Sequence, residues 1–292
     1  KWVSDDKYID SWGVKWQAAK NSEGQTMYYD MVEHPLEDAT SLSEVENYDW
    51  PEPGPFTHIK GLEKKASLLR EEINYALVGH MGTTSIFELS WYLRSMEEFF
   101  VDLLKRKEIA DTILNKVFQI RKRQMKEYLL RVGSYLDVVA VGDDLSMQTG
   151  PLISPTAYRN MIKPYHEKYF NFIKNLTPAK LHMHSCGSVS ALLPDLIEVG
   201  VDVINPVQVS AEGMSPEKLM DQFEGKIAFW GGIDTQQTLP NDSVNEVREE
   251  VLKRIRQFKG NNGGYIVNSV HNIQADVPPE NIVEMFKTAY EV

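Results

Sequence analysis

After about residue 60, short apolar runs alternate with longer segments in which apolar residues recur every three to four positions. Such short runs are typical of buried strands, and the longer segments are typical of amphipathic helices. The pattern predicts strands at 75–79, 138–142, 180–184, 201–207, 226–232 and 264–268. It predicts helices at 86–104, 109–130, 155–173, 189–198, 244–258 and 279–290. Pro155, Pro216 and Pro279 stand where a first helical turn should lie, which is a favoured place for proline.

Strands that alternate with helices pair in parallel through right-handed crossovers. Six such units in a chain of 292 residues predict a (β/α)8 TIM barrel of the α/β class. Its first strand would lie upstream or have an atypical sequence, and because the chain begins at Lys1 we expect it to lack part of the amino-terminal region. An open doubly wound sheet is the structural alternative, although no strand is followed by a glycine-rich dinucleotide loop.

Residues 1–60 follow a different pattern. Two aromatic-rich stretches, 8–16 and 25–30, are typical of strands, and a polar turn at 21–24 separates them. The proline-rich stretch 50–55 then ends any regular element. We therefore expect a hairpin cap and linker over residues 1–60 and the barrel domain over residues 61–292.

Composition excludes several classes of function. A hydrophobic content of 42% and a charged content of 25% are typical of a soluble globular protein. The net charge of -11 disfavours binding to nucleic acid or to an anionic membrane, and no apolar run approaches membrane-spanning length. One cysteine cannot form an internal disulfide, so we expect a reducing compartment and a cytoplasmic protein.

In a barrel of this kind, chemistry gathers at the carboxyl ends of the strands. The predicted strands are followed by polar side chains that can bind a ligand, and none of them ends in arginine or lysine. These residues are His80, Asp143 with Asp144, His184 with Cys186, Gln208, Asp234 and His271. Their shared position at strand ends indicates a site.

The strongest group follows the strand at 180–184. Because side chains at alternate positions of a strand point the same way, His182, His184 and Cys186 share a face. His184, Cys186 and His271 would hold zinc and leave a fourth position for substrate. One alternative is a buried Cys186 beside a hydrogen-bonded His184. Another is a nucleophilic Cys–His pair, whose thiolate would be favoured by the dipole of a helix starting directly after Cys186.

The other candidates each have an ordinary structural alternative. Adjacent Asp143 and Asp144 point in opposite directions, so we expect one to face the barrel axis and the other to cap a helix or loop. Gln208 would orient substrate or cap a turn. Asp234 follows two glycines that would allow a ligand to approach the backbone or only ease a tight turn. His80 and His182 are candidate substrate-binding residues, with capping or core packing as the alternative.

The chain resembles the uroporphyrinogen decarboxylase superfamily over roughly residues 72–292. The resemblance lies in His184-Ser185-Cys186-Gly187, in Gly231-Gly232-Ile233-Asp234, and in His271 followed by Val277-Pro278-Pro279-Glu280-Asn281. The His-x-Cys-Gly stretch is similar to that of zinc-dependent methyltransferases that work with corrinoid proteins, and to the zinc site of cobalamin-independent methionine synthase. This resemblance implies a (β/α)8 barrel and a zinc ion held by His, Cys and a later Cys, a position that His271 takes here. True decarboxylases have a histidine there but lack His-x-Cys-Gly, and their arginine-rich amino-terminal signature is absent from this chain.

The resemblance implies a methyltransferase that moves a methyl group from a small O-, N- or S-methylated substrate to a corrinoid protein or a thiol. Zinc and a corrinoid carried by a partner protein would be the cofactors. Asp143 or Asp144, and Asp234, would position the substrate or supply a proton. Uroporphyrinogen-type tetrapyrrole decarboxylation is the alternative, but its polycarboxylated substrate needs cationic partners that the strand ends do not offer. A barrel that carries a corrinoid or tetrapyrrole without turnover is a third hypothesis.

Overall fold

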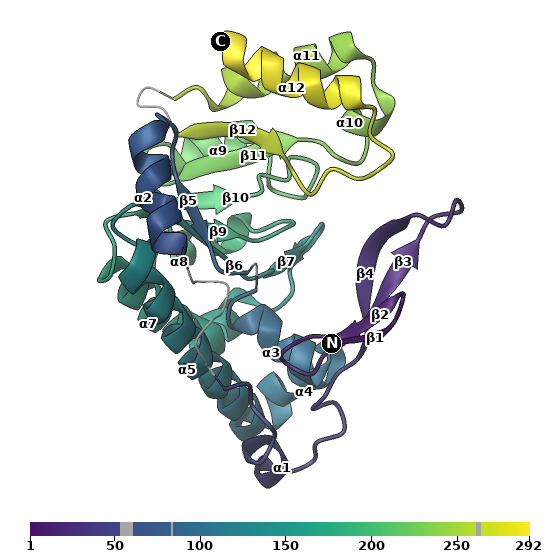
Figure 1. The fold of residues 1–292 in the computed structure, drawn as a ribbon, viewed down its shortest axis with the longest axis vertical. Helices are drawn as coiled ribbons and strands as arrows, with labels where there is room; N and C mark the ends of the chain where they lie inside the picture. The colour runs from purple at the N-terminus through teal and green to yellow at the C-terminus, as the bar shows by residue number, and fades with distance from the viewer. Residues whose placement is uncertain (53–60, 83, 261–263) are drawn as a thin grey trace. The chain divides into compact units, whose positions relative to one another are not determined.

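The computed structural model describes residues 1–52, 61–82, 84–260 and 264–292 (Figure 1). Contacts between residues divide the chain into two compact units. The first unit comprises Lys1–Asp143 and Thr156–Ala179, and the second comprises Asp144–Pro155 and Lys180–Val292. The linker expected at 50–55 lies partly outside the described residues. The division into a cap over residues 1–60 and a barrel over residues 61–292 stays a prediction.

The first unit begins with an antiparallel sheet of β1 (Trp2–Ser4), β2 (Lys7–Ile9), β3 (Lys15–Lys20) and β4 (Thr26–Glu33), in that order. The predicted turn at 21–24 joins β3 to β4. The single strand predicted at 8–16 is wrong, because the chain turns between β2 and β3. The carboxylate of Asp10 accepts hydrogen bonds from the backbone N–H groups of Trp12 and Val14, which stabilises that turn.

The same unit contains two parallel strands, β5 (Val78–His80) and β6 (Val138–Gly142). The predicted strand at 138–142 is confirmed, and β5 is shorter than the predicted 75–79. In sequence, the helices of this unit lie before β5, between β5 and β6, and after β6, and several of them pack on α5. They are α1 (Leu42–Glu46), α2 (Leu62–Glu72), α3 (Phe87–Arg94), α4 (Met96–Lys105), α5 (Lys107–Val132), the short α6 (Pro155–Ala157) at the unit boundary, the π-helical turn η2 (Tyr158–Ile162) and α7 (Lys163–Lys174).

The helix predicted at 86–104 is broken at Ser95, whose φ of 69° lies in the left-handed region. Ser95 caps α4, because its hydroxyl accepts the backbone N–H of Glu98. The side chain of Arg94 is fully buried and donates to the Asp102 carboxylate at 2.8 Å. Arg94 also donates to the backbone carbonyls of Leu36 and Glu37. These bonds stabilise the break, and hydrophobic periodicity alone does not reveal them.

The second unit contains four parallel strands, β9 (Lys180–His184), β10 (Val203–Asn205), β11 (Ala228–Ile233) and β12 (Tyr265–Ser269), side by side in that order. Their helices are the 3-10 turn η3 (Ser190–Leu192) with α8 (Leu193–Glu198), α9 (Pro216–Phe223), α10 (Thr238–Asn241), α11 (Val244–Phe258) and α12 (Pro279–Glu291). A short antiparallel pair, β7 (Ser146–Met147) and β8 (Gly150–Pro151), precedes them. The bounds predicted for β9 and α11 are confirmed, and Pro216 and Pro279 each occupy a first helical turn.

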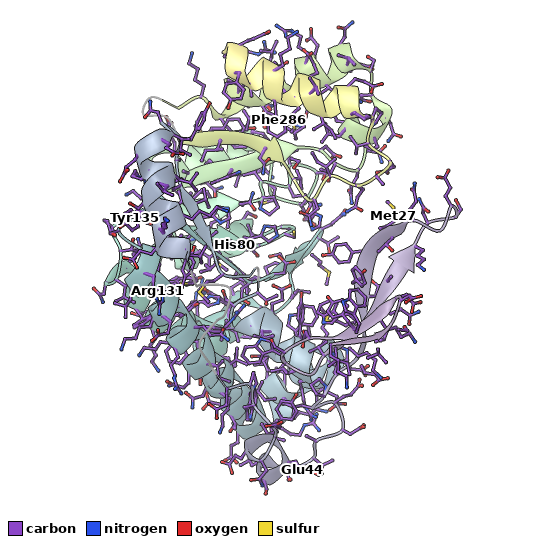
Figure 2. All side chains as sticks on the ribbon, viewed as in Figure 1. Met27, Glu44, His80, Arg131, Tyr135 and Phe286 are labelled. Atoms are coloured by element: carbon purple, nitrogen blue, oxygen red, sulfur yellow. The ribbon has the colours of Figure 1, made fainter. Side chains whose placement is uncertain are left out.

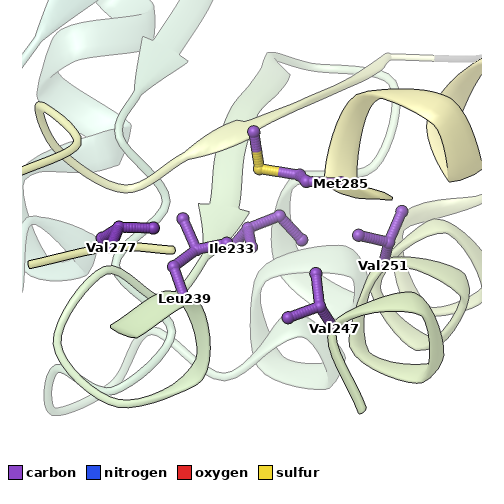
Figure 3. Close-up of a cluster of buried hydrophobic side chains, with 6 residues drawn as sticks. All are labelled: Ile233, Leu239, Val247, Val251, Val277 and Met285. Atoms are coloured by element: carbon purple, nitrogen blue, oxygen red, sulfur yellow. The ribbon is translucent and has the colours of Figure 1, made fainter. Parts of the chain in front are cut away.

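A hydrophobic cluster joins the end of β11 to the helices that follow it (Figure 3). Its side chains come from β11, α10, α11, α12 and the segment before α12: Ile233, Leu239, Val247, Val251, Val277 and Met285. All six are buried, so they contribute the apolar burial that stabilises this part of the unit. Because Ile233 is fixed in this cluster, the position of the next residue, Asp234, is fixed as well.

The predicted alternation of strands and helices is confirmed, and the fold is α/β with parallel strands in both units. Closure into an eight-stranded barrel stays a prediction. Among the described residues, none of the helices combines the length and apolar character needed to cross a lipid bilayer. A cytoplasmic location stays a prediction too.

Removal of the Asp102 carboxylate tests the contact that stabilises the helix break. Asp102→Ala removes the buried carboxylate that pairs with both Arg94 and Arg106, and it leaves the buried guanidinium of Arg94 with the longer pair to Glu98 at 3.5 Å. We expect the free energy of unfolding to fall by about 3–5 kcal/mol. Glu33→Ala is the matched control, because it removes the exposed pair with Lys15 and should cost less than about 1 kcal/mol. Urea denaturation of both variants measures the difference. Equal decreases in the free energy of unfolding of the two variants would contradict the role of Asp102 in stabilising the helix break.

Candidate metal centre

Three side chains with metal-ligating atoms meet where β9 ends. Atoms of Asp144, His184 and Cys186 that could bind a metal all lie within 4.8 Å of one another. The Cys186 Sγ lies 3.3 Å from the Nε2 of His184, and that Nε2 lies 3.9 Å from the Oδ1 of Asp144. All three residues are half-buried. The structure thus places together a sulfur, an imidazole nitrogen and a carboxylate oxygen.

Asn205 orients the imidazole of His184. Its Nδ2 donates to the carbonyl of Trp230 at 3.2 Å, so its Oδ1 is directed to the Nδ1 of His184, 2.7 Å away. An amide oxygen only accepts hydrogen bonds, so Nδ1 carries a proton. In the neutral imidazole the lone pair is then on Nε2, which faces Cys186 and Asp144. A ring held in this way through its other nitrogen is the usual arrangement of a metal-ligating histidine.

The segment that carries Asp144 is bonded directly to the loop that carries Cys186. The backbone N–H of Cys186 donates to the Asp144 carboxylate at 2.7 Å, and the N–H of Leu145 donates to the hydroxyl of Ser185 at 3.0 Å. Ser185 is fully buried, so this second bond is shielded from water. Asp144, which is distant from β9 in sequence, is fixed beside it by these two bonds.

Gly187 allows the same segment to approach closely. Its φ of 83° is left-handed, and a Cβ there would lie 2.6 Å from the carbonyl oxygen of Met147. The N–H of Gly187 donates to the Oε1 of Gln208 at 3.0 Å. Gln208 therefore supports the loop after Cys186.

The helix predicted at 189–198 is present as η3 followed by α8, but it begins at Ser190, four residues after Cys186. The backbone N–H of Cys186 is donated to Asp144 instead of pointing along a helix. The helix dipole therefore gives no reason for a reactive thiolate at this position. The Sγ of Cys186 lies 3.3 Å from the Nε2 of His184, a distance that suits a nucleophilic Cys–His pair as well as two ligands of one metal ion. Both interpretations of Cys186 stay predictions.

Asp143 and Asp144 have different partners. The carboxylate of Asp143 is buried and accepts the backbone N–H groups of Ile86, Phe87 and Glu88 at the start of α3. It also bonds the Nε2 of buried His166 at 2.8 Å. Asp143 therefore caps a helix in the first unit, which is the alternative that the sequence left open for one member of the pair. Asp144 is the member beside His184 and Cys186.

A cavity of about 300 Å³ lies beside the group of Asp144, His184 and Cys186. The residues of its wall all belong to the second unit: Ser146, Met147, Gln148, Cys186, Gly187, Gln208, Ser210, Asp234, Thr235, Gln236, Val270 and His271. Among the sequence-predicted residues, this places Cys186, Gln208, Asp234 and His271 together. The Oδ1 of Asp234 accepts the N–H groups of Gln236 and Gln237, which fixes its carboxylate at the cavity wall.

The two glycines before Asp234 approach protein atoms rather than an open ligand position. A Cβ at Gly231 would lie 2.8 Å from the backbone nitrogen of Val207, and one at Gly232 would lie 2.9 Å from the hydroxyl of Tyr265. Both have left-handed φ values. Close packing within the second unit explains why both positions are glycine. Approach of a ligand to the backbone is not needed to explain them.

His271 lies next to the three-residue group but is not one of its members. Its ring centroid is 6.4 Å from that of His184. Burial, and then the neighbouring His184, lower the pKa of His271, although Asp144 partly opposes them. The imidazole is therefore neutral at neutral pH. The structure thus groups Asp144 with His184 and Cys186 where the sequence had placed His271, whose role as a ligand stays a prediction.

The two remaining candidate histidines do not line the cavity. His182 is buried, and its ring packs edge-on against Trp230 with centroids 5.0 Å apart. His80 ends β5 in the first unit (Figure 2). Their proposed roles in substrate binding stay predictions. Asn205 was missed, although its position at the end of a predicted strand was a signal that could have identified it.

Comparisons with known proteins agree with the fold. The sequence model of the uroporphyrinogen decarboxylase family matches residues 24–292. The chain is 25% identical over 235 residues to a uroporphyrinogen decarboxylase of Legionella pneumophila, covering 78% of this chain and 62% of that protein. It is 26% identical over 144 residues to the enzyme of that name from Geotalea daltonii, covering 49% of this chain and 39% of that protein. The chain thus spans from 39% to 62% of the length of these two curated relatives.

A solved structure has the same fold over nearly the whole chain. It is a methyltransferase from Methanosarcina mazei, with a TM-score of 0.68 and 16% sequence identity. The match covers 97% of this chain and 77% of that chain. At this identity the likeness shows the fold alone.

Substitution of Asn205 tests its effect on the His184 ligand. Asn205→Leu removes the acceptor for Nδ1, and we expect zinc affinity to fall by about 10- to 100-fold. Asn205→Asp keeps an acceptor and should bind zinc nearly as well as the wild type, although it loses the bond to Trp230. Competition with a chromogenic chelator measures the affinity.

Asn281→Leu is the matched control for this experiment. Asn281 is a buried amide that donates to the carbonyls of Leu239 and Asp242 and is not among the residues of the cavity wall. Its loss should lower stability and leave zinc affinity unchanged. If Asn205→Leu bound zinc as tightly as the control, Asn205 would have no part in orienting the ligand.

The adjacent aspartates should respond in opposite ways to substitution. Asp143→Ala leaves the start of α3 without its cap and should lower the free energy of unfolding by about 3 kcal/mol, with zinc affinity unchanged. Asp144→Ala should lower zinc affinity about tenfold or more and leave stability nearly unchanged. Urea denaturation and zinc titration of both variants measure the two effects. Loss of zinc binding in a folded Asp143→Ala protein would contradict the assignment of Asp143 to helix capping and of Asp144 to the metal group.

Proposed function

The chain belongs to the uroporphyrinogen decarboxylase family, and we propose that it is a zinc-dependent methyltransferase within it. It would transfer a methyl group from a small methylated substrate to a corrinoid protein or a thiol. The observation that carries this proposal is the close grouping of Asp144, His184 and Cys186 beside a cavity. Conversion of a tetrapyrrole does not call for such a set of ligand atoms, whereas a bound metal does.

The residues present fit zinc. Thiolate sulfur, imidazole nitrogen and carboxylate oxygen are its usual protein ligands, and three of them leave a fourth position for substrate. The lone pair of His184 faces the other two ligand atoms because Asn205 holds the ring. When bound, the ion would act as a Lewis acid on the heteroatom of the methyl donor or lower the pKa of an attacking thiol.

The chain's own side chains would position the substrate. The cavity of about 300 Å³ is at the small end of ligand pockets, which suits a small methylated molecule. Gln208 holds the Cys186 loop, and Asp234 presents a carboxylate whose orientation is fixed by two backbone N–H groups. The neutral imidazole of His271 can accept or donate a hydrogen bond at the cavity wall.

The name of the Methanosarcina mazei protein, a methyltransferase, is consistent with this proposal, although the low identity limits that support to the fold. The names of the curated relatives favour the second candidate, decarboxylation of uroporphyrinogen. Two observations weigh against that candidate. The cavity is small for a tetrapyrrole, and its described lining includes no lysine or arginine to pair with the substrate's carboxylates.

Substitution of the single cysteine tests the proposal. Cys186→Ser replaces the thiolate with a poor zinc ligand, so we expect zinc bound per chain to fall below half and methyl transfer to cob(I)alamin to fall at least about 100-fold. Elemental analysis measures the metal, and absorption spectroscopy follows methylation with O-, N- and S-methyl donors. Ser210→Ala, a similarly small change at the cavity wall, is the control and should keep its zinc. Full methyl transfer by metal-free protein, or conversion of uroporphyrinogen seen by chromatography, would overturn the proposal.

A further inference from the structure

Among the described residues that line the cavity, one has an acidic side chain. Of these twelve residues, Asp234 is the one carboxylate. The others that form hydrogen bonds are amides, hydroxyls and an imidazole, and the described lining contains no lysine or arginine. A substrate in this cavity therefore meets a carboxylate without a cation to neutralise it.

Two arginines of the second unit form ion pairs away from the cavity. Arg248 on α11 pairs with Glu284 and Glu291 of α12, and Arg254 pairs with Glu250 on its own helix. None of these residues is part of the cavity wall.

We propose that Asp234 determines the charge of the substrate, so that the cavity accepts small methylated molecules that are neutral or cationic and rejects anionic ones. This inference rests on the proposed function and specifies its substrate class. An anionic donor such as a methoxylated carboxylic acid would lose its hydration beside Asp234 and gain no cationic partner. Amines, alcohols, ethers and thioethers avoid this cost. Specificity therefore comes from a repulsive group as well as from attractive contacts.

Three molecules of similar shape and different charge test the proposal: choline, its neutral carbon analogue 3,3-dimethylbutan-1-ol, and the anion 3,3-dimethylbutanoate. Binding to the purified protein is measured by calorimetry, without corrinoid or methyl transfer. We expect the anion to bind at least tenfold more weakly than the alcohol, and choline to bind at least as tightly as the alcohol. Added salt should weaken choline binding and leave the alcohol unchanged.

Asp234→Asn identifies the residue responsible. The amide oxygen can still accept the N–H groups of Gln236 and Gln237, while the charge is removed. We expect the ratio of the dissociation constant of the anion to that of the alcohol to fall about tenfold in this variant. Asp221→Asn, at an exposed position on α9 outside the cavity wall, is the matched control and should keep the wild-type ranking.

The outcomes separate this inference from the proposed function. Equal binding of the three probes to the wild type, binding of none of them, or an unchanged ranking in Asp234→Asn would overturn the charge selection. Each of these results would leave the metal group and methyl transfer to be judged by the Cys186→Ser experiment. Charge selection without any methyl transfer would contradict the proposed function alone.

Discussion

The candidate site depends on one hydrogen bond, between the Oδ1 of Asn205 and the Nδ1 of His184. Parallel pairing of β9 and β10 places these two residues directly opposite each other. The amide of Asn205 is fixed in turn by the carbonyl of Trp230 on β11. Three adjacent strands therefore determine which nitrogen of one imidazole is available to a metal. A shift in strand register would remove this arrangement before it changed any ligand itself.

Asp143 and Asp144 are adjacent residues with different structural roles. The chain passes between them from one compact unit to the other. Asp143 stabilises the start of α3 and contacts buried His166, whereas Asp144 receives the N–H of Cys186. Opposite directions of adjacent side chains make this division possible. Each of the two adjacent carboxylates therefore stabilises its own unit.

Much of this organisation could be predicted from sequence wherever the determining pattern is local. The bounds of β9 and α11 follow from periodicity and from flanking residues. The predicted strand-end residues include four of the twelve that line the cavity. What could not be predicted depends on contacts between distant segments. The break at Ser95 involves Asp102 and the carbonyls near Leu36, and the position of Asp144 depends on Ser185.

Cys186 is the single thiol of the chain, and it is accessible at the cavity wall. Its alkylation or oxidation therefore alters one known place and no other sulfhydryl. A dye attached there reports on the cavity without engineering of the background, and a bound ion would slow its attachment. Because the chain has one cysteine, no second thiol can form an internal disulfide with an oxidised Cys186. Overoxidation of its Sγ would remove the sulfur ligand from the group of Asp144, His184 and Cys186.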